Sequence, residues 1–396
     1  MFDVVAIGEL LIDFTPVSGS LPKTSDVGNN GSARPCFEQN PGGAPANVAV
    51  AAAQMGKRAA FIGKVGEDAF GRFLRETLES RGVDVSGLLS TNAYPTTLAF
   101  VHLDTSGERS FSFYRNPSAD VMLEPDDVDP ELLSQTKLFH FGSVSMTADP
   151  SRTATLASVR AARNAGAIIS YDPNLRLSLW KDQEAAKEVI LGAMQYADVL
   201  KVSDEELRFL TGETGIEDGI EVLRRYHQCA ITLVTLGAEG CYYSAACGSG
   251  SVPSYAVHAI DTTGAGDAFV GAFVSELLDA LDELERPGRA HGVAGISASG
   301  PVPVSDETTA QGKFNRNMLN PSVLGRSTPG RNMLGRNMLG RNMLGGITEE
   351  RLQQAIRFAN TSGALTTTKR GGIPALPTKR EVFEYMQHHL PLNEDY

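Results

Sequence analysis

Cysteine is scarce in this sequence, and the few cysteines show no pairing pattern. The 396 residues contain four of them, at Cys36, Cys229, Cys241 and Cys247. None belongs to a Cys-x-x-Cys pair, and no histidine stands at zinc-finger spacing from any of them. The pattern therefore gives no sign of a disulfide framework or a zinc site. It favours free thiols in a reducing cytosol, so we expect a cytoplasmic protein.

Long hydrophobic runs are also missing. A membrane helix needs roughly 20 consecutive apolar residues, and no stretch of the sequence approaches that length. The first residues, Met-Phe-Asp-Val-Val-Ala-Ile-Gly-Glu-Leu-Leu-Ile-Asp-Phe, carry three acidic side chains and no basic one. They predict a buried strand and not a signal peptide. We therefore expect no association with a membrane.

The sequence lacks an excess of positive charge and two common nucleotide-binding motifs. Its formal net charge of -12 argues against a broad surface for nucleic acid, because a polyanion needs a positive field. A local basic site for a nucleotide is still compatible with this charge. No Gly-x-x-x-x-Gly-Lys-Ser/Thr occurs, which excludes a P-loop protein. No Gly-x-Gly-x-x-Gly with a following acidic partner occurs either, which disfavours a dehydrogenase.

The composition itself is ordinary for a soluble globular protein, with 42% hydrophobic and 21% charged residues. Short apolar runs typical of buried strands alternate with segments that have helical spacing. The expected strands are Val4–Gly8, Ala59–Gly63, Leu138–Gly142, Ile168–Asp172, Val199–Val202 and Ile231–Leu236. The expected helices are Ala46–Met55, Phe70–Arg81, Ser151–Ala165, Glu184–Tyr196 and Ile216–Tyr226. Such an alternation predicts a three-layer α/β/α fold, in which helices cover both faces of a mostly parallel sheet.

One stretch departs from this alternation and predicts a small hairpin. Thr97–Leu103 and Arg109–Tyr114 flank Asp104-Thr-Ser-Gly107, which is a turn sequence. In the second segment Phe111 and Phe113 alternate with serines, a period of two residues. We expect a small β-sheet that closes over a cleft as a lid.

From about 287 to 345 the periodic pattern stops. Glycine, proline, serine and asparagine dominate there, and Gly-Arg-Asn-Met-Leu occurs three times in tandem from Gly330, with a related stretch at Asn315–Asn320. A five-residue period fits neither helix nor strand burial, and the run is too short for a solenoid. We expect a flexible surface insertion between a helix that ends near Leu284 and one that begins near Thr348. A partner-binding segment is the alternative.

The strongest functional signal is the thirteen-residue run Asp261-Thr-Thr-Gly-Ala-Gly-Asp-Ala-Phe-Val-Gly-Ala-Phe. Gly264, Ala265 and Gly266 expose backbone N–H groups where a helix is expected to begin, and a helix N-terminus attracts anions. Asp267 then stands in the first turn, beside any phosphate held there. A carboxylate in that place can accept the proton of an attacking hydroxyl. Helix capping is the alternative for an isolated motif, but the length of the run favours the functional interpretation.

This run resembles the C-terminal signature of the ribokinase-like (PfkB) sugar kinases. Asn40-Pro-Gly-Gly-Ala-Pro-Ala-Asn-Val-Ala-Val-Ala resembles their N-terminal signature. The two stand in the expected order, and the resemblance covers nearly the whole chain except the insertion. It implies a single domain over 1–396 with a ribokinase-like fold, whose lid comes from about 12–45 and 95–116. It also implies a sugar kinase that uses ATP.

The resemblance implies a role for each matching residue. Asp267 becomes the catalytic base, and Gly264, Ala265 and Gly266 form the anion hole for the transferring phosphoryl group. On the sugar side the implied residues are Asp13, Gly42, Gly43, Asn47, Arg115 and Arg176. Four of these have simpler alternatives: a strand-end turn for Asp13, a helix cap for Asn47, a solvated hairpin charge for Arg115 and a surface ion pair for Arg176.

Among the residues implied for the nucleotide and the metal, this sequence departs from the family pattern at one position. The family's Asn-x-x-Glu motif aligns with Ser203-Asp-Glu-Glu206, so Glu206 matches as a metal-organising residue, whereas Ser203 replaces asparagine and a helix cap is its alternative. Mg²⁺ is implied because it offsets the charge of ATP. Asp261 and Thr263, with Arg370–Gly372, match a region that holds a monovalent cation in many relatives, so K⁺ is a candidate. The other implied nucleotide residues are Lys201, Thr235, Gly237, Gly240, Asn360 and Gly363; a strand-end turn is the alternative for Thr235 and Gly237.

The substrate class also comes from resemblance. Ile7–Phe14, Phe113–Asp120, Asp172–Arg176 and Thr366–Pro377 together look more like fructokinases than ribokinases or adenosine kinases. We expect ATP-dependent phosphorylation of D-fructose to fructose 6-phosphate. The alternatives are a kinase of the same fold that acts on ribose or 2-keto-3-deoxygluconate, and a non-catalytic scaffold. A homodimer through the lid is also expected, because relatives often pair there and an exposed hairpin edge would suit it.

Overall fold

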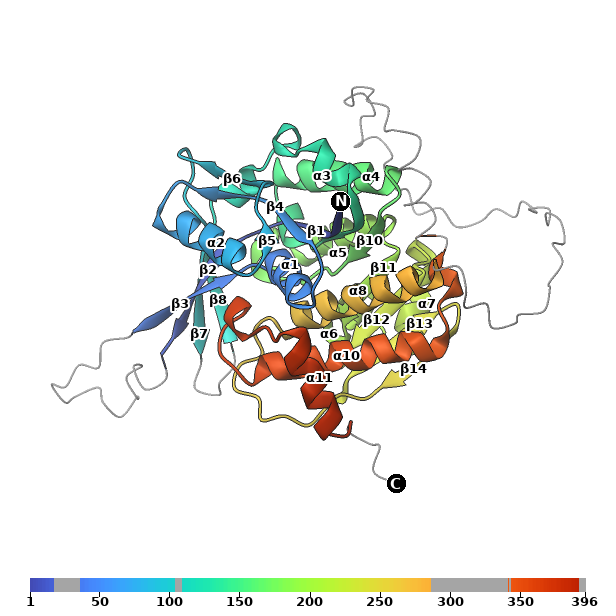
Figure 1. The fold of residues 1–396 in the computed structure, drawn as a ribbon. Helices are drawn as coiled ribbons and strands as arrows, with labels where there is room; N and C mark the ends of the chain where they lie inside the picture. The colour runs from blue at the N-terminus through green and yellow to red at the C-terminus, as the bar shows by residue number, and fades with distance from the viewer. Residues whose placement is uncertain (18–35, 104–108, 286–340, 342, 392–396) are drawn as a thin grey trace, which may run out of the picture.

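A large, mostly parallel sheet forms the centre of the computed structural model (Figure 1). The structure describes residues 1–17, 36–103, 109–285, 341 and 343–391. The described strands of this sheet follow the order β14 (Gly248–Val252), β13 (Cys241–Ala245), β12 (Ile231–Thr235), β11 (Val199–Ser203), β10 (Ile168–Tyr171), β9 (Thr136–Phe141), β1 (Phe2–Ile7), β4 (Ala59–Gly66) and β5 (Val83–Asp84), with β6 (Leu88–Thr91) paired to β4. Neighbouring strands are parallel from β12 to β5, whereas β13 and β14 are antiparallel additions at one edge.

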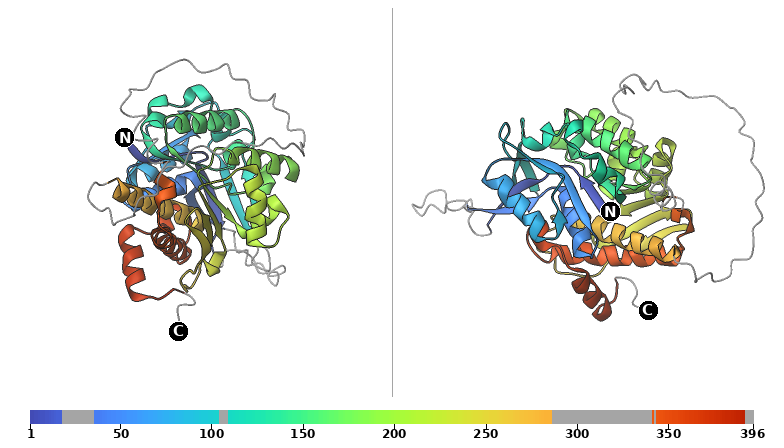
Figure 2. Two further views of the ribbon diagram at one scale, coloured as in Figure 1. Left: turned by 90° about the vertical axis from the view of Figure 1, so that its right-hand side faces the viewer. Right: turned by 45° about the horizontal axis from the view of Figure 1, so that its top comes forward.

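Helices lie on both sides of the sheet, so the predicted three-layer α/β/α arrangement is confirmed (Figure 2). One layer contains α1 (Ala44–Gln54), α2 (Ala69–Ser80), α8 (Ala265–Leu284), α10 (Glu349–Thr367) and α11 (Lys379–His388). The opposite layer contains α3 (Pro130–Ser134), α4 (Ser151–Asn164), α5 (Gln183–Met194), α6 (Asp204–Thr211) and α7 (Ile216–Tyr226).

Two hydrophobic cores result, one on each face of the sheet. Successive side chains of a strand point to opposite faces. In β1, Val4 and Ala6 therefore belong to the core beneath α1 and α8, while Val5 and Ile7 belong to the core beneath α4 and α5. All four side chains are fully buried. The strand reads as a continuous apolar run because both of its faces are covered.

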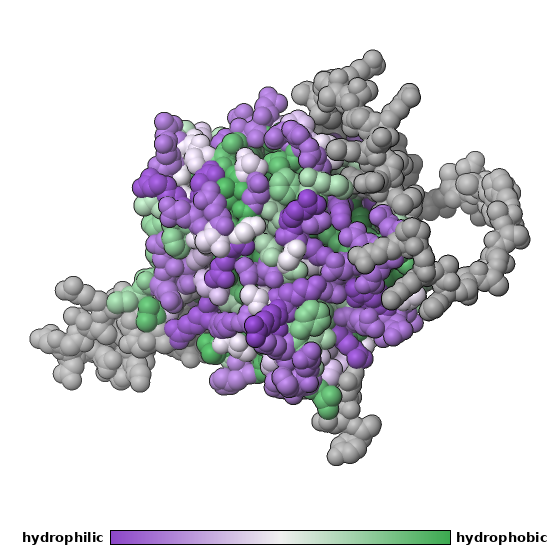
Figure 3. Space-filling model, in the orientation of Figure 1, coloured by the Kyte–Doolittle hydropathy of each residue, from purple (hydrophilic) through white to green (hydrophobic). Residues whose placement is uncertain are grey.

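In the view of Figure 3, hydrophilic residues dominate the described surface and hydrophobic ones are scattered. Among the described helices, none combines the length and the apolar composition that crossing a bilayer requires.

A separate four-stranded sheet projects from one end of the molecule (Figure 1). Its order is β3 (Phe37–Gly42), β2 (Leu11–Pro16), β7 (Leu98–Leu103) and β8 (Arg109–Tyr114). The predicted hairpin corresponds to β7 and β8, and its turn lies outside the described residues. The sheet is larger than a hairpin because β2 pairs parallel to β7 and antiparallel to β3. β2 follows β1 closely in the chain, and β3 leads into α1. The small sheet therefore joins the central sheet at the carboxyl end of β1.

Most of the predicted insertion lies outside the described residues, but its end does not. Arg341 of the last Gly-Arg-Asn-Met-Leu copy donates from Nη2 to Asp198 Oδ1 at 2.8 Å. Leu344 of the same copy is 6% exposed and belongs to the core beneath α8. The last copy of the repeat therefore packs against the central domain, and the bounds 287–345 of the insertion stay a prediction.

Candidate active site

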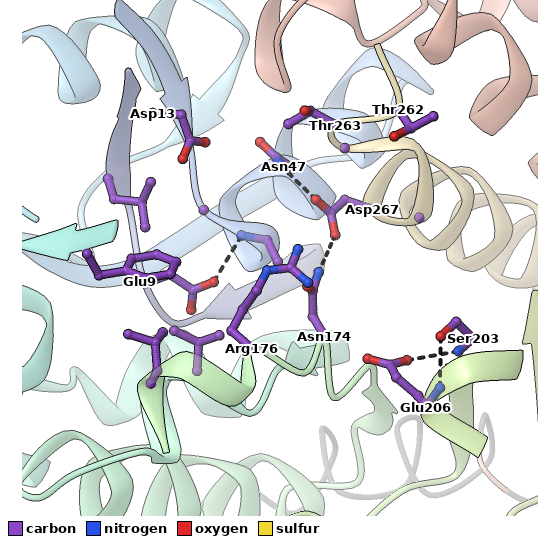
Figure 4. Close-up of a pocket in the computed structure, with 18 of the residues that line it drawn as sticks. Glu9, Asp13, Asn47, Asn174, Arg176, Ser203, Glu206, Thr262, Thr263 and Asp267 are labelled. Atoms are coloured by element: carbon purple, nitrogen blue, oxygen red, sulfur yellow. Dashed lines mark hydrogen bonds between the residues drawn. The ribbon is translucent and has the colours of Figure 1, made fainter. Parts of the chain in front are cut away.

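A polar cavity of about 360 Å³ lies between the small sheet and the carboxyl ends of the central strands (Figure 4). Ligands of open α/β sheets bind at this end of the strands. The small sheet, the segments after β1 and β10, the end of β11 and the start of α8 all contribute to its wall. Its lining consists of Glu9, Leu11, Asp13, Gly43, Ala44, Asn47, Phe113, Val144, Asn174, Arg176, Leu179, Lys201, Ser203, Glu206, Thr262, Thr263, Gly264, Gly266 and Asp267.

Asp267 is held in this wall from two sides. It lies in the first turn of α8, and the residue before the helix, Gly264, has a φ of 77°, a left-handed conformation that favours glycine. Asn47 of α1 donates from Nδ2 to Asp267 Oδ2 at 2.7 Å. Asn174, in the segment after β10, donates from Nδ2 to Asp267 Oδ1 at 3.0 Å. Three distant parts of the chain thus fix the orientation of one buried carboxylate.

The environment of Asp267 suits proton transfer. Burial raises the pKa of this carboxyl to about 6, because removal from water disfavours its charged form. The hydrogen bond from Asn47 lowers the pKa, Asp172 raises it, and the positive charges of Lys201 and Arg176 lower it. A carboxylate with a pKa close to the operating pH accepts and releases protons efficiently.

The start of α8 presents backbone donors to the cavity. Gly264 and Gly266 line it, whereas Ala265 is not among the lining residues and its N–H donates to the Thr262 carbonyl at 3.3 Å. The first N–H groups of a helix have no carbonyl partner within that helix. Those of Gly266 and Asp267 are therefore suited to an anion, and the helix dipole adds to the attraction.

Lys201 supplies a fixed positive charge beside this turn. Its Nζ lies 3.0 Å from Asp172 Oδ2, and both side chains are buried. A Cβ atom on Gly266 would lie 3.2 Å from Nζ, so the lysine lies directly against the start of α8. Burial alone would lower the pKa of Lys201, but the carboxylates of Asp172 and Glu206 outweigh it and raise the pKa. The lysine therefore stays cationic.

The two glycines on the sugar side allow close approach of the chain to Asp13. A Cβ atom on Gly42 would overlap Oδ2 of Asp13, and one on Gly43 would overlap the Glu9 carbonyl. Gly43 also precedes α1 with a φ of 115°. Burial raises the pKa of Asp13 to about 7; Arg176 lowers it and Asp267 raises it. Asp13 and Asp267 thus interact electrostatically across one cavity.

The two predicted sugar-side arginines differ in position. Arg176 follows β10 and points into the cavity in Figure 4. Arg115 is not among the lining residues of this cavity. Its Nε donates to Asp120 Oδ2 at 2.7 Å, and its other nitrogens donate to Thr147 Oγ1 and to the Val144 carbonyl. The alternative for Arg115, a solvated hairpin charge, is wrong, because the side chain is buried and paired with Asp120. Its closure over the substrate stays a prediction.

Ser203 and Glu206 form the start of α6 in addition to lining the cavity. Ser203 Oγ accepts from the Glu206 N–H at 3.1 Å, and Glu206 Oε2 accepts from the Ser203 N–H at 2.8 Å, a capping box. Glu206 Oε1 accepts from the Leu175 N–H at 2.7 Å. Among the described residues, no group of three or more potential ligands of the His, Cys, Asp and Glu types forms a metal cage.

Of the remaining predicted residues, Thr263 lines the cavity and the others do not. Asp261 organises the turn before α8, because Oδ1 accepts from the Thr263 N–H and hydroxyl and Oδ2 accepts from the Gly371 N–H. Asn360 of α10 donates to the carbonyls of Val252 and Pro253. Four further residues lie at the end of β12, in the turn after it and in α10: Thr235, Gly237, Gly240 and Gly363.

The lining residues to which the sequence analysis assigned no role include Glu9, Asn174 and Phe113. Glu9 stands just after the buried strand β1, and Asn174 just after β10. A polar residue close after an apolar strand is a signal that the sequence contains, and it would have found both. Asn174 also has a φ of 46°, which asparagine tolerates better than most residues. Phe113 lies in β8 and gave no comparable signal.

Comparison with known proteins agrees with this geometry. Residues 1–307 match the model of the pfkB family of carbohydrate kinases. A protein named Fructokinase-1 from Zea mays is 39% identical over 384 residues, which cover 97% of each chain. The crystal structure of a fructokinase with bound ATP from Xylella fastidiosa has a TM-score of 0.74 and 29% identity and covers 98% of this chain and 99% of that one. A fructokinase from Vibrio cholerae O395, with fructose, ADP and calcium ion bound, has a TM-score of 0.70, 30% identity and coverages of 97% and 99%. The chain belongs to the pfkB family of carbohydrate kinases.

Proposed function

We propose that this protein is a fructokinase that transfers the γ-phosphoryl group of ATP to the 6-hydroxyl of D-fructose. The observation that carries the proposal is the buried carboxylate of Asp267 at the start of α8, in one cavity with Asp13. The first position suits proton removal beside a bound phosphate, and the second suits a sugar hydroxyl. The similarity to proteins named fructokinases supports the choice of sugar.

In the proposed reaction, fructose binds between Asp13 and Asp267, beneath Phe113 of the small sheet. Asp267 takes the proton of the 6-hydroxyl while that oxygen attacks the γ-phosphorus in line. The N–H groups at the start of α8 and the Lys201 ammonium stabilise the charge on the transferring group. Closure of the small sheet over the sugar would exclude water and limit wasteful hydrolysis of ATP.

ATP is proposed to extend from the start of α8 past Ser203 toward Thr235 and Gly237. Ser203 and Thr235 are partners in the register of β11 and β12, so they lie side by side at the carboxyl ends of these strands. Glu206 fits a role in the water shell of Mg²⁺, because this ion usually takes most of its ligands from phosphate and water. When bound, Mg²⁺ would offset the charge of the phosphates. The Asp261 turn is the proposed place for K⁺.

A coupled assay of ADP release across sugars tests this proposal. We expect a higher kcat/KM for fructose than for ribose or 2-keto-3-deoxygluconate, and a requirement for Mg²⁺. A higher value for either of the other two would overturn the choice of fructose. ATP binding without ADP release for any sugar would instead indicate a scaffold.

The pH dependence of the reaction should follow the buried carboxylates of Asp267 and Asp13. Asp267 must be ionised to act as the base, and its pKa lies at about 6, while that of Asp13 lies at about 7. At low concentrations of both substrates, where the rate reflects ionisation of the free enzyme, activity should therefore fall as the pH is lowered from about 7 to below 6. An Asp13→Asn variant should have lower activity at every pH. Its activity should show only the decrease near pH 6 that Asp267 causes. A rate that is flat across this range in both proteins would contradict the assignment of the base.

We further propose a homodimer through the small sheet. Phe37 and Tyr114 are 38% and 66% exposed, and each packs edge-on against Phe100, so the sheet presents an aromatic surface. A second copy of the chain would cover it. Tyr114→Glu should shift the sedimentation coefficient of the dimer to that of a monomer, whereas Tyr226→Glu, at an exposed tyrosine of α7, should leave it unchanged. A monomeric wild-type protein would refute the proposal.

A further inference from the structure

Glu9 is a buried carboxyl group in the cavity wall that the proposed reaction does not use. It follows β1 and is only 3% exposed. Its Oε1 accepts from the Ala44 N–H at 3.0 Å. Within the described part of the chain, its Oε2 is buried and has no hydrogen-bond partner. A buried polar oxygen without a partner is energetically unfavourable, and such an atom at the wall of a binding cavity is positioned for a ligand.

The contact with Ala44 also fixes where Glu9 points. Ala44 is the first residue of α1, and the preceding Gly43 packs against the backbone of Glu9. The carboxyl group is therefore held against the start of the helix before any ligand arrives. A preorganised acceptor of this kind costs little conformational entropy on binding.

Glu9 and Asp267 lie on different sides of the cavity. Figure 4 shows them apart, and both are tied to the first turn of α1, through Ala44 and Asn47 respectively. Their charged surroundings also differ. Arg115 and Asp120 act on Glu9, whereas Asp172, Lys201 and Arg176 act on Asp267.

This separation matches the shape of a ketohexose. In the furanose ring of fructose, the hydroxymethyl groups that carry the 6- and 1-hydroxyls are attached to the two carbons that flank the ring oxygen. If the 6-hydroxyl is at Asp267, the opposite hydroxymethyl group projects toward the other side of the cavity. We infer that Glu9 binds the 1-hydroxyl of the substrate and selects ketohexoses over sugars that lack this group; this rests on the proposed function.

The chemistry of the carboxyl group fits this role in either ionisation state. Burial raises the pKa of Glu9 to about 7, its own hydrogen bonds and Arg115 lower it, and Asp120 raises it. The ionised form accepts the hydroxyl proton, and the neutral form can donate to the hydroxyl oxygen. A sugar without this hydroxyl would leave Oε2 unpaired in a closed site, which is how polar sites reject deoxy analogues.

A cycle that combines enzyme variants and substrate analogues tests the inference. The measured quantity is the ratio of kcat/KM for fructose to kcat/KM for 1-deoxyfructose. We expect about 10² or more in the wild type. In Glu9→Met, which removes both oxygens at similar volume, we expect the ratio to fall to about tenfold or less. In Glu9→Gln, which keeps an acceptor for the Ala44 N–H and therefore the fold, we expect an intermediate ratio, because an unpaired amide costs less than an unpaired carboxylate.

A merely structural role for Glu9 would give a different result. It would lower activity on both sugars by the same factor and leave the ratio unchanged in both variants, which would overturn the inference. As a control, 2,5-anhydromannitol keeps the 1-hydroxyl and lacks only the anomeric one, so the ratio of fructose to this analogue should be the same in wild type and variants. If the wild type does not phosphorylate fructose, the proposed function fails instead; if it does and the first ratio is unaffected, only the role of Glu9 fails.

Discussion

Replacement of Asp267 by asparagine is expected to lower kcat by about 10³-fold, within the range that general bases contribute. The amide has nearly the same shape as the carboxylate but cannot accept the proton of the attacking hydroxyl. ATP binding should change little, because the backbone N–H groups at the start of α8 and Lys201 are both retained. The measurements are steady-state kcat with fructose and the Kd of ATP.

The variant should fold, because the surroundings of residue 267 can adapt. At present Asn47 and Asn174 both donate to the Asp267 carboxylate. An asparagine at 267 would turn one of these contacts into a clash of two NH₂ groups. Asn47 can relieve it by turning its amide, since its Oδ1 is buried and has no partner among the described residues.

A matched substitution on the same helix provides the control. Asp279 lies three turns further along α8 and forms ion pairs with Lys57 and Lys379, outside the cavity. Asp279→Asn should leave kcat unchanged and lower the unfolding temperature slightly, because partly exposed ion pairs contribute about 1 kcal/mol or less. Near-normal turnover of Asp267→Asn would show that another group removes the proton, and the proposed mechanism would be wrong.

The fold could be predicted from the sequence because strands that are buried on both faces appear in it as continuous apolar runs. Val4 to Ile7 read as one apolar run since alternate side chains enter two different cores. The antiparallel strands β13 and β14 have no such apolar run. In β13 the buried residues Cys241, Tyr243 and Ser244 do not form an apolar run. In β14 only Val252 is buried, and the sequence Gly-Ser-Gly-Ser-Val has a single branched residue and no aromatic one.

The site was predictable where its chemistry is local and not where it depends on distant contacts. The turn before Asp267 is a continuous motif, so its position at the start of a helix followed from the sequence. The donation from Asn174 to Asp267 joins residues that are 93 positions apart, and nothing local indicates it. The burial of Arg115 was not predictable either, because its side chain is fixed by contacts with Asp120 and Thr147 that no local pattern indicates.

Asp13→Asn is expected to reduce kcat/KM for fructose by about 10²-fold, chiefly through a higher KM. A hydrogen bond to a charged group contributes about 1.5–3 kcal/mol, and roughly 1.4 kcal/mol corresponds to a tenfold change. The carboxylate can accept from two sugar hydroxyls, whereas the amide offers one acceptor and places donors where the other oxygen was. The structure limits compensation, because Gly42 packs directly against Asp13 Oδ2 and the side chain has little room to move.

The split between KM and kcat distinguishes a sugar-binding role for Asp13 from a structural one. If Asp13 only supports the small sheet, Asp13→Asn should lower the unfolding temperature and should affect all sugars alike. If it binds the sugar, the loss should appear in KM for fructose while the Kd of ATP stays constant. Asp3→Asn, on strand β1 of the central sheet, is the matched control, since Asp3 pairs with Arg58 and Lys137 and does not line the cavity. An unchanged KM in Asp13→Asn would show that this residue does not bind the sugar. The proposed orientation of the substrate would then be wrong as well, because it depends on carboxylates at both Asp13 and Asp267.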